Sequence, residues 1–353
     1  MALRLIADRR RLGVTATGAV AVVDPSTSRS GLFRLVRDRR CAPFPEARVN
    51  AVGSPFRGTN GNGDVVGFAD MHLHITANER AGGAVIYGEP FDRYGIAEAL
   101  GHDADVHGAD GSLDVTGNLL RTGLPFGTHD THGWPTFAGW PMHDTVTHQQ
   151  TYYVWLKRDW LAGERLVVAQ TVEDQPICEI EPVKAHGCNE TKSVRLQVQT
   201  LRGLQRYVDL QAGGRGRGWF RLVYNPRQAR RAIERGKLAA KIELLKAYRN
   251  KRRYFGVGLG TDTGGFSSLP GPRPDADRLP LTYPFRCYDG KVRFDREQTG
   301  GRGFDLNTDG IAHYGLLADL VADMQQHGGG QALRSLFRSA EAYLRLWQRA
   351  YRR

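Results

Sequence analysis

The chain has 353 residues, of which 41% are hydrophobic, so it can build a substantial core in one large domain or two ordinary ones. Its formal net charge is +12. The arginines are spread over both ends and the middle of the chain instead of forming one patch, so we predict no nucleic-acid partner. No apolar run reaches the roughly 20 residues that a membrane span needs, so we also predict no membrane association.

The N-terminal part predicts little regular structure. Short strands are expected within residues 13–37, around the turn at residues 24–26, and a loop rich in glycine and asparagine follows at 53–63. We therefore divide the chain into an irregular N-terminal arm, residues 1–60, and a main domain, residues 61–353. Arg9 to Arg11 followed by the apolar residues 12–23 resembles the start of a signal peptide without a clear cleavage site.

The four cysteines contain no Cys-x-x-Cys pair, so a structural zinc site built from cysteines is not expected. Cys178 and Cys188 lie ten residues apart in a stretch with turn-forming residues. Either a local disulfide or two free thiols fits this stretch, and the disulfide would need an oxidising compartment. We predict a cytoplasmic protein, with export as the alternative.

The main domain opens with a short apolar run that ends in two histidines, residues 67–74. Alternate side chains of a strand share a face, so His72 and His74 point the same way. Imidazole nitrogens are preferred ligands of zinc. The pair therefore predicts a metal site at the end of this strand.

Two further stretches are rich in polar residues. Residues 77–125 show little periodicity and predict a long loop excursion, which in a compact domain is usually functional. The next stretch places His129, His132, His143 and His148 among aromatic residues and prolines, as in the wall of a polar pocket. We expect one or two of these four histidines to face the site.

The middle of the chain alternates helical and strand-like patterns. Apolar residues at three-to-four spacing predict helices, and short β-branched runs predict buried parallel strands. The predicted order is helix 147–162, strand 165–172, helix 190–211, strand 219–223, helix 226–234 and a strand at 237–242. Such alternation is typical of an α/β protein.

Residues 254–266 form an apolar stretch with many small residues that delivers Asp262 into a glycine-rich turn. A carboxylate there can bind a metal ion or accept a proton from water. Further on, a hairpin is expected around residues 288–290, and helices at 316–326 and 331–350. His313 lies just before these helices and is a candidate for a group that faces the substrate.

The strand with His72 and His74, residues 68–74, resembles the first-strand His-x-His motif of the amidohydrolase superfamily. Residues 256–262 are similar to the last-strand segment of its membrane-dipeptidase-like branch, in which the first-strand motif is usually His-x-Asp. The phrases at 127–135, 168–174 and 307–315 resemble a group of bacterial proteins of that kind. The similarity covers most of residues 65–350.

This resemblance implies an α/β fold, a TIM-barrel-like (β/α) metal-dependent hydrolase. His72 and His74 would be metal ligands, and Asp262 would orient or deprotonate the attacking water. Only sixteen residues separate Lys237 from Tyr254, whereas each βα unit takes roughly thirty. We therefore predict an incomplete barrel of about five or six strands, in which the strand at 254–261 lies beside the strand of His72.

The interval between Lys237 and Tyr254 admits two readings. Residues 241–243 could lie near the position where this superfamily places a bridging ligand. Residues 237–253 also fit one basic amphipathic helix, because apolar residues recur at helical spacing, and we favour the helix. An incomplete sheet has an exposed edge that can pair with another chain, so we predict a homo-oligomer.

Two functions remain open. The first is a metal-dependent hydrolase that acts on a small-molecule or peptide-like substrate through a divalent ion, with zinc expected. Its ligands would be His72, His74, Asp262 and one further histidine, which could be His148, His186 or His313; we choose His148. The second is a catalytically inactive remnant that binds a ligand or a partner protein.

Overall fold

A computed structural model describes residues 11–15, 17–23, 44–55, 58–243 and 257–351. The chain divides into two compact units, Met1–Phe44 and Pro45–Arg353. In the first unit, β1 (Arg11–Val14) pairs antiparallel with β2 (Val20–Val23). The turn expected at residues 24–26 lies outside the described residues. The second unit begins before the predicted boundary at residue 60, because β3 (Ala51–Val52) pairs with β9 (Arg293–Phe294) of the main domain.

The centre of the second unit is a parallel sheet of four strands. They are β4 (Phe68–Leu73), β5 (Glu164–Gln170), β6 (Phe220–Val223) and β7 (Leu238–Glu243). The order across the sheet is β4-β5-β7-β6, so β7 lies between β5 and the edge strand β6. The α/β fold with a parallel sheet is thus confirmed. The described residues show this open sheet and no closed barrel.

The segment 257–263 extends the sheet beyond β4. Isolated parallel bridges join Asp70 to Leu259 and Leu73 to Thr263. Since β5 already occupies one edge of β4, this segment lies along the other edge. The strand predicted at 254–261 beside the His72 strand is therefore confirmed for residues 257–261, and residues 254–256 lie outside the described part of the chain.

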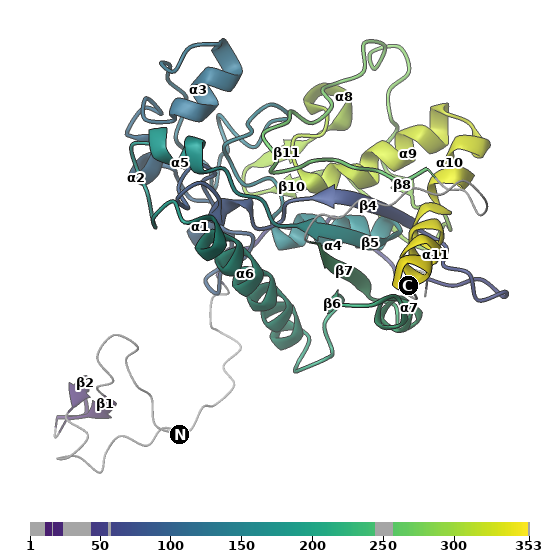
Figure 1. The fold of residues 1–353 in the computed structure, drawn as a ribbon, viewed down its shortest axis with the longest axis horizontal. Helices are drawn as coiled ribbons and strands as arrows, with labels where there is room; N and C mark the ends of the chain where they lie inside the picture. Colours follow the sequence, from purple (N-terminus) through teal and green to yellow (C-terminus); the bar gives the residue numbers. More distant parts are fainter. Residues whose placement is uncertain (1–10, 16, 24–43, 56–57, 244–256, 352–353) are drawn as a thin grey trace. The chain divides into compact units, whose positions relative to one another are not determined.

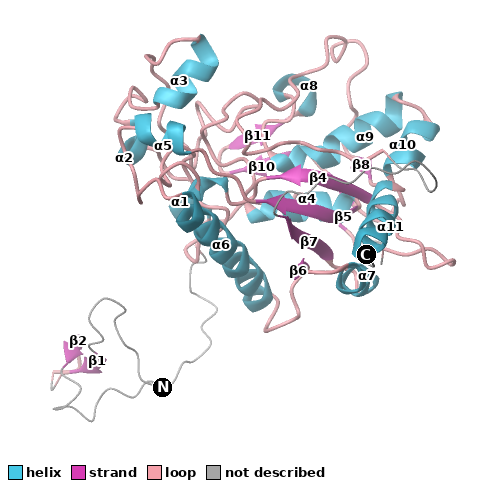
Figure 2. Cartoon of the chain, in the orientation of Figure 1, coloured by secondary structure: helices cyan, strands magenta, loops and turns pink. Residues whose placement is uncertain are grey.

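Helices cover both faces of the sheet (Figures 1 and 2). Residues that alternate along a strand enter different cores, as expected for a parallel sheet buried on both sides. On β7, Ala239 packs with α7 (Pro226–Glu234) and α11 (Ser339–Tyr351). Its neighbours Leu238 and Ala240 belong to the larger core, which includes α4 (Tyr153–Ala162) and α6 (Glu190–Gln211).

The structure decides between the two predictions for this stretch: it confirms the strand expected at 237–242 and corrects the helix favoured for residues 237–253. Leu238 to Glu243 form strand β7, and residues 244–253 lie outside the described part of the chain. Leu238 and Ile242 are four residues apart, a spacing that fits a helix and also one face of a strand. The neighbouring strands on both sides of β7 decide for the strand, since tertiary pairing overrides local propensity.

Several predicted boundaries agree closely with the structure. Helix α6 spans the predicted residues, and the side chain of Asn189 accepts a hydrogen bond from the backbone nitrogen of Lys192 at its start. Helix α7 also matches, with Asn225 as its cap and Pro226 in its first turn. Helix α4 is shorter than predicted and begins at Tyr153. The predicted helix 331–350 is two helices, α10 (Gly330–Leu336) and α11.

The predicted loop region 77–125 contains short helices: η1 (Ala77–Glu79), α1 (Ile96–Ala99), α2 (Ala104–His107) and α3 (Val115–Thr122). Cys178, in α5 (Gln175–Ile180), forms a disulfide with Cys188. The remaining elements are β8 (Phe285–Arg286), β10 (Glu297–Thr299), β11 (Arg302–Phe304), α8 (Leu306–Asp309), η2 (Tyr314–Leu316) and α9 (Leu317–His327). Strands β8 and β9 form the predicted hairpin. Within the described residues, no helix combines the length and apolar character that a membrane crossing requires.

Candidate metal centre

His72, His74 and Asp262 meet at the carboxyl end of β4, and we call them the open triad. The Nε2 atoms of the two histidines are 3.1 Å apart, and each lies 3.1 Å from Oδ1 of Asp262. The three atoms thus form a nearly equilateral triangle. Ligand atoms around one tetrahedral ion with bonds of about 2.0–2.1 Å would lie roughly 3.3–3.5 Å apart. The triad could hold a metal ion with small side-chain movements.

The backbone around Asp262 is specialised for this placement. Asp262 has a φ of +55°, which is uncommon for a residue with a side chain. A Cβ at Gly265 would lie 2.0 Å from Oδ1 of Asp262, so only glycine leaves room for the carboxylate. Oδ2 accepts a hydrogen bond of 2.7 Å from the hydroxyl of Ser267. The turn therefore fixes the direction in which Oδ1 points.

The contacts of His74 indicate which of its nitrogens is free to bind a cation. Its Nδ1 lies 3.2 Å from the carbonyl oxygen of Gln170, which can only accept a hydrogen bond. Burial lowers the pKa of His74, with Asp262 acting in the opposite direction, so the neutral ring is favoured. A neutral ring with its proton on Nδ1 directs the Nε2 lone pair at the triad, the arrangement found in histidine ligands of metals.

The buried carboxylate of Asp70 holds the backbone next to the triad in place. Oδ1 of Asp70 accepts hydrogen bonds from the backbone nitrogens of His72 (3.0 Å) and Thr261 (3.2 Å). Oδ2 accepts from the hydroxyls of Thr261 and Tyr314. Burial raises the pKa of Asp70, and these hydrogen bonds act against the rise. Asp70 thus joins β4 to the segment that carries Asp262.

Solvent reaches the triad. The side chain of His72 is 44% exposed and that of Asp262 is 32% exposed, whereas His74 is buried. A site with three protein ligands and an accessible side is typical of catalytic metal sites, which leave a position for water or substrate.

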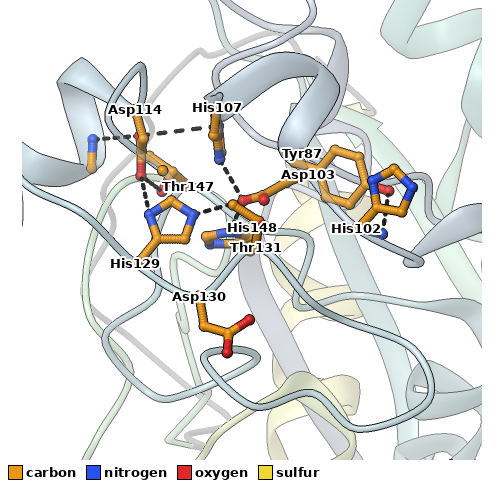
Figure 3. Close-up of polar contacts among 12 residues, drawn as sticks. Tyr87, His102, Asp103, His107, Asp114, His129, Asp130, Thr131, Thr147 and His148 are labelled. Atoms are coloured by element: carbon orange, nitrogen blue, oxygen red, sulfur yellow. Dashed lines mark hydrogen bonds and ion pairs between the residues drawn. The ribbon is translucent and has the colours of Figure 1, made fainter. Parts of the chain in front are cut away.

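A second group of potential ligands lies in the loop region. Asp103, His107, His129 and His148 form what we call the buried histidine cluster, and they too could hold a metal ion. His148 was predicted to complete the triad, but the structure places it in this group (Figure 3). Oδ2 of Asp103 lies 2.7–2.8 Å from one ring nitrogen of each histidine.

The charges in the buried cluster influence one another strongly. Burial alone would raise the pKa of Asp103, but its hydrogen bonds to the three histidines outweigh that effect and leave the pKa below its usual value. Burial also acts to lower the pKa of His107, but the hydrogen bond to Asp103, the negative charges of Asp114 and Asp103 and the contact with the carbonyl oxygen of Val85 together outweigh burial, so the pKa is raised. For His148 burial dominates and lowers the pKa to about 4.

The structure places the other candidate histidines elsewhere. His313 is fully buried, lies 3.1 Å from Glu297 through Nε2 and stacks on Trp155. Its role facing a substrate stays a prediction. His186 contacts the carbonyl oxygen of Glu79 through Nε2. Among the four histidines at 129–148, His132 is exposed and contacts Asp130.

Sequence reasoning missed Asp103 and His107. A signal was present, because an Asp and a His four residues apart face each other on one helical turn, here α2 with Asp103 at its N-cap. It also missed Asp70, Gln170 and Ser267, whose role is to position the triad, since nothing in their local spacing marks them.

Comparison with known proteins gives no match: no family model, no curated protein and no solved structure matches the chain. A surface cavity of about 470 Å³ is present between α7 and α11. Its lining residues include Arg227, Arg230 and Tyr351 but no member of the triad or of the buried cluster. The ligand atoms themselves therefore define the candidate sites.

Proposed function

We propose that the protein is a metal-dependent hydrolase that cleaves an amide or ester-type bond at the open triad. The observation that carries this proposal is the triangle of His72 Nε2, His74 Nε2 and Asp262 Oδ1, with sides of 3.1 Å, at a solvent-accessible strand end. In parallel α/β folds, ligands bind outside the carboxyl ends of the strands. The sequence resemblance to amidohydrolases points to the same residues independently.

A divalent ion bound there, with zinc as the expected metal, would lower the pKa of its water from about 15.7 towards ~7. His72 and His74 would hold the ion through Nε2. Asp262 would share in binding through Oδ1, and its exposed carboxylate could accept the proton that the attacking water loses. The hydroxyl of Ser267 would keep Oδ2 oriented while this happens.

The proposal extends to the fold. We propose that the open sheet is part of an incomplete TIM-barrel-like architecture of the membrane-dipeptidase-like kind, in which residues 257–263 take the place of the last strand beside the first. The parallel bridges of this segment to β4 support the assignment. We predicted five or six strands. Among the described residues the sheet has four strands, and this extended segment would be the fifth.

One observation favours the alternative, an inactive remnant that binds a ligand or partner. The group at the carboxyl end of β4 has three potential ligands among the described residues, and His148 belongs to the other group. A remnant would retain metal binding without turnover.

Metal content combined with turnover tests the proposal. We would replace His72 and His74 by Ala, singly and together, and measure zinc by mass spectrometry and hydrolysis of a dipeptide panel and of p-nitrophenyl esters. The proposal expects each single change to lower metal affinity at least about tenfold, because each ligand in a small set contributes strongly. His132→Ala, at an exposed histidine outside the triad, is the control. Unchanged metal content and turnover in the double variant would refute the proposal.

Substrate class, assembly and compartment are proposals too. We propose that the substrate is a small molecule or peptide-like and that the protein forms a homo-oligomer. The Cys178–Cys188 disulfide favours the exported alternative over the cytoplasmic one, because disulfides persist in oxidising compartments.

A further inference from the structure

The buried histidine cluster has features that hydrogen bonding alone explains poorly. Nδ1 of His107, Nε2 of His129 and Nε2 of His148 all approach one oxygen, Oδ2 of Asp103, at 2.7–2.8 Å (Figure 3). The other oxygen of that carboxylate, Oδ1, is buried and has no hydrogen-bond partner. Buried carboxylates normally have hydrogen bonds on both oxygens, whereas here three ring nitrogens face Oδ2 and none faces Oδ1.

Counting protons sharpens the point. Nε2 of His107 lies 3.2 Å from the carbonyl oxygen of Val85, while its Nδ1 faces Asp103 at 2.8 Å. Both partners are acceptors, but a neutral imidazole carries a single N–H. A protonated ring can donate to both acceptors, but in a neutral ring whose Nε2 donates to Val85 the lone pair of Nδ1 faces a carboxylate oxygen. A cation between them removes this repulsion.

Two of the ring nitrogens that face away from Asp103 also lack the hydrogen bonds that would explain the cluster. Nδ1 of His129 and Nδ1 of His148 are buried and have no hydrogen-bond partner. One ring nitrogen of each of the three histidines therefore converges on Oδ2 of Asp103. The side chains of the four residues are at most 8% exposed, so bulk water does not serve as their partner.

A second carboxylate completes the charge balance. Asp114 is buried, and its oxygens lie 4.0 Å from Nε2 of His107 and 3.8 Å from Nδ1 of His129. Asp114 is held by the backbone nitrogen of Gly117 and the hydroxyl of Thr147, each at 2.8 Å. With neutral histidines, Asp103 and Asp114 contribute two negative charges, which a divalent cation would neutralise. Carboxylates in this outer position orient histidine ligands.

We propose that Asp103, His107, His129 and His148 form a closed, structural site for a divalent cation that prefers nitrogen ligands, with zinc fitting best. Three nitrogens and one oxygen make a tetrahedral set without an open position, as in structural zinc sites. Their ligand atoms lie within 4.8 Å of one another. Seating the ion would require the Asp103–histidine separations to widen by roughly half an ångström.

A cation at this site would stabilise residues 103–148, a region with little regular structure. Its ligands come from both ends of α2, from residue 129 and from residue 148, which pairs with Tyr87 through an isolated bridge. An ion that joins these segments closes long loops, and its binding free energy then contributes to folding. This role is independent of the chemistry at the open triad.

The experiment measures metal retention in the full chain. Wild type, His129→Gln and the control His132→Gln, whose side chain is 75% exposed, would be loaded with zinc, dialysed against a chelator and analysed by mass spectrometry. We expect the chelator to remove the ion from the solvent-accessible triad, so wild type and His132→Gln should retain one equivalent, held by the buried histidine cluster. His129→Gln should bind more weakly by over tenfold, since even an outer partner of a ligand is worth about 10–100-fold in affinity.

A spectroscopic measurement covers the case in which His129→Gln does not fold. In His72→Ala, which weakens the open triad, one equivalent of Co²⁺ should give the intense visible absorption of tetrahedral coordination. Absence of this band, or equal zinc retention in wild type and a folded His129→Gln, would overturn the proposal. A wild type that binds no ion and keeps its Tm after chelation would mean that protons alone hold the cluster, and this too would overturn it.

Discussion

The open triad and the buried histidine cluster are made from the same kinds of side chain, yet their surroundings differ in every respect that matters for chemistry. His72 and Asp262 are 44% and 32% exposed, whereas no side chain of the buried cluster exceeds 8%. The triad offers three ligand atoms and the cluster offers four. An accessible set can exchange water and substrate, and a closed set can only hold what it encloses.

The two groups also differ in what supports them. The triad rests on the central sheet, through Asp70 and the turn at Gly265. The buried cluster rests on short helices and loops, with Asp114 as its neighbour. We therefore expect changes in the triad to affect turnover with little loss of stability, and changes in the buried cluster to affect stability first.

The largest effect is expected from Asp262→Asn. This change keeps the size of the side chain but removes the base, so turnover should fall by roughly 10²–10⁴-fold, the range typical of general acid–base groups. The free energy of unfolding in urea should change by less than about 1 kcal/mol, because the side chain is partly exposed. Asp277→Asn, at an exposed position, is the control. Turnover equal to that of the control would remove Asp262 from the chemistry.

The counterpart in the buried cluster is Asp103→Ala. This change leaves three histidines without the carboxylate that they share, and breaking a buried charged pair typically costs about 3–5 kcal/mol. Urea unfolding measures the loss. Asp130→Ala is the matched control, since Asp130 is exposed and contacts one exposed histidine. A loss below about 1 kcal/mol would mean that the cluster contributes little to stability.

A smaller effect is expected from Gly265→Ala. The new Cβ would lie 2.0 Å from Oδ1 of Asp262 and would push the carboxylate aside. Misplacing a catalytic group by about 1 Å can lower the rate about 10²-fold. Kinetic measurements should show this loss, while Gly61→Ala, where nothing lies within 4 Å of the added Cβ, should be neutral. Full activity in Gly265→Ala would show that the direction of Oδ1 is unimportant.

The smallest effect concerns Glu164, whose Oε1 lies 2.7 Å from the hydroxyl oxygen of Tyr314 in the core beside Asp70. The single proton of that hydroxyl goes to Asp70, so a protonated Glu164 donates to the hydroxyl oxygen. Burial, and then the negative charge of Asp70, raise the pKa of Glu164 well above 4.5. The folded state therefore binds a proton more tightly than the unfolded state, so this contribution to stability is full below about pH 4 and is lost as the pH rises.

Glu164→Gln should make the free energy of unfolding less dependent on pH above about pH 4. The amide NH₂ can donate to the hydroxyl oxygen of Tyr314 at every pH, as the protonated carboxyl does only at low pH. Urea titrations between pH 4 and 8 measure the slope, with exposed Glu234→Gln as the control. An identical slope in both variants would contradict the assignment.

The parts predicted well from the sequence are those in which local signals and packing agree. Helix α6 has apolar residues at helical spacing and an Asn cap, and its bounds match. His72 and His74 follow from strand alternation alone, and their Nε2 atoms are indeed adjacent. Asp262 was placed correctly because the segment 257–263 lies beside β4.

The parts predicted poorly depend on contacts between distant segments. Residues 238–243 fit a helix locally and form a strand because β5 and β6 flank them. His148 was assigned to the triad because its sequence neighbourhood is polar and aromatic, but its partner Asp103 lies 45 residues earlier in the chain. No local pattern connects the two, so the buried cluster could not be found from spacing.

The ligands of the buried histidine cluster all come from one stretch of the chain, residues 103–148, whereas the triad needs both residue 72 and residue 262. A ribosome that adds about 5–20 residues per second produces Asp262 roughly six to twenty-three seconds after His148. The closed set of ligands is therefore complete on the nascent chain while the open set still lacks its carboxylate. The order in which the two become complete is set by the direction of synthesis and not by their relative affinity for an ion.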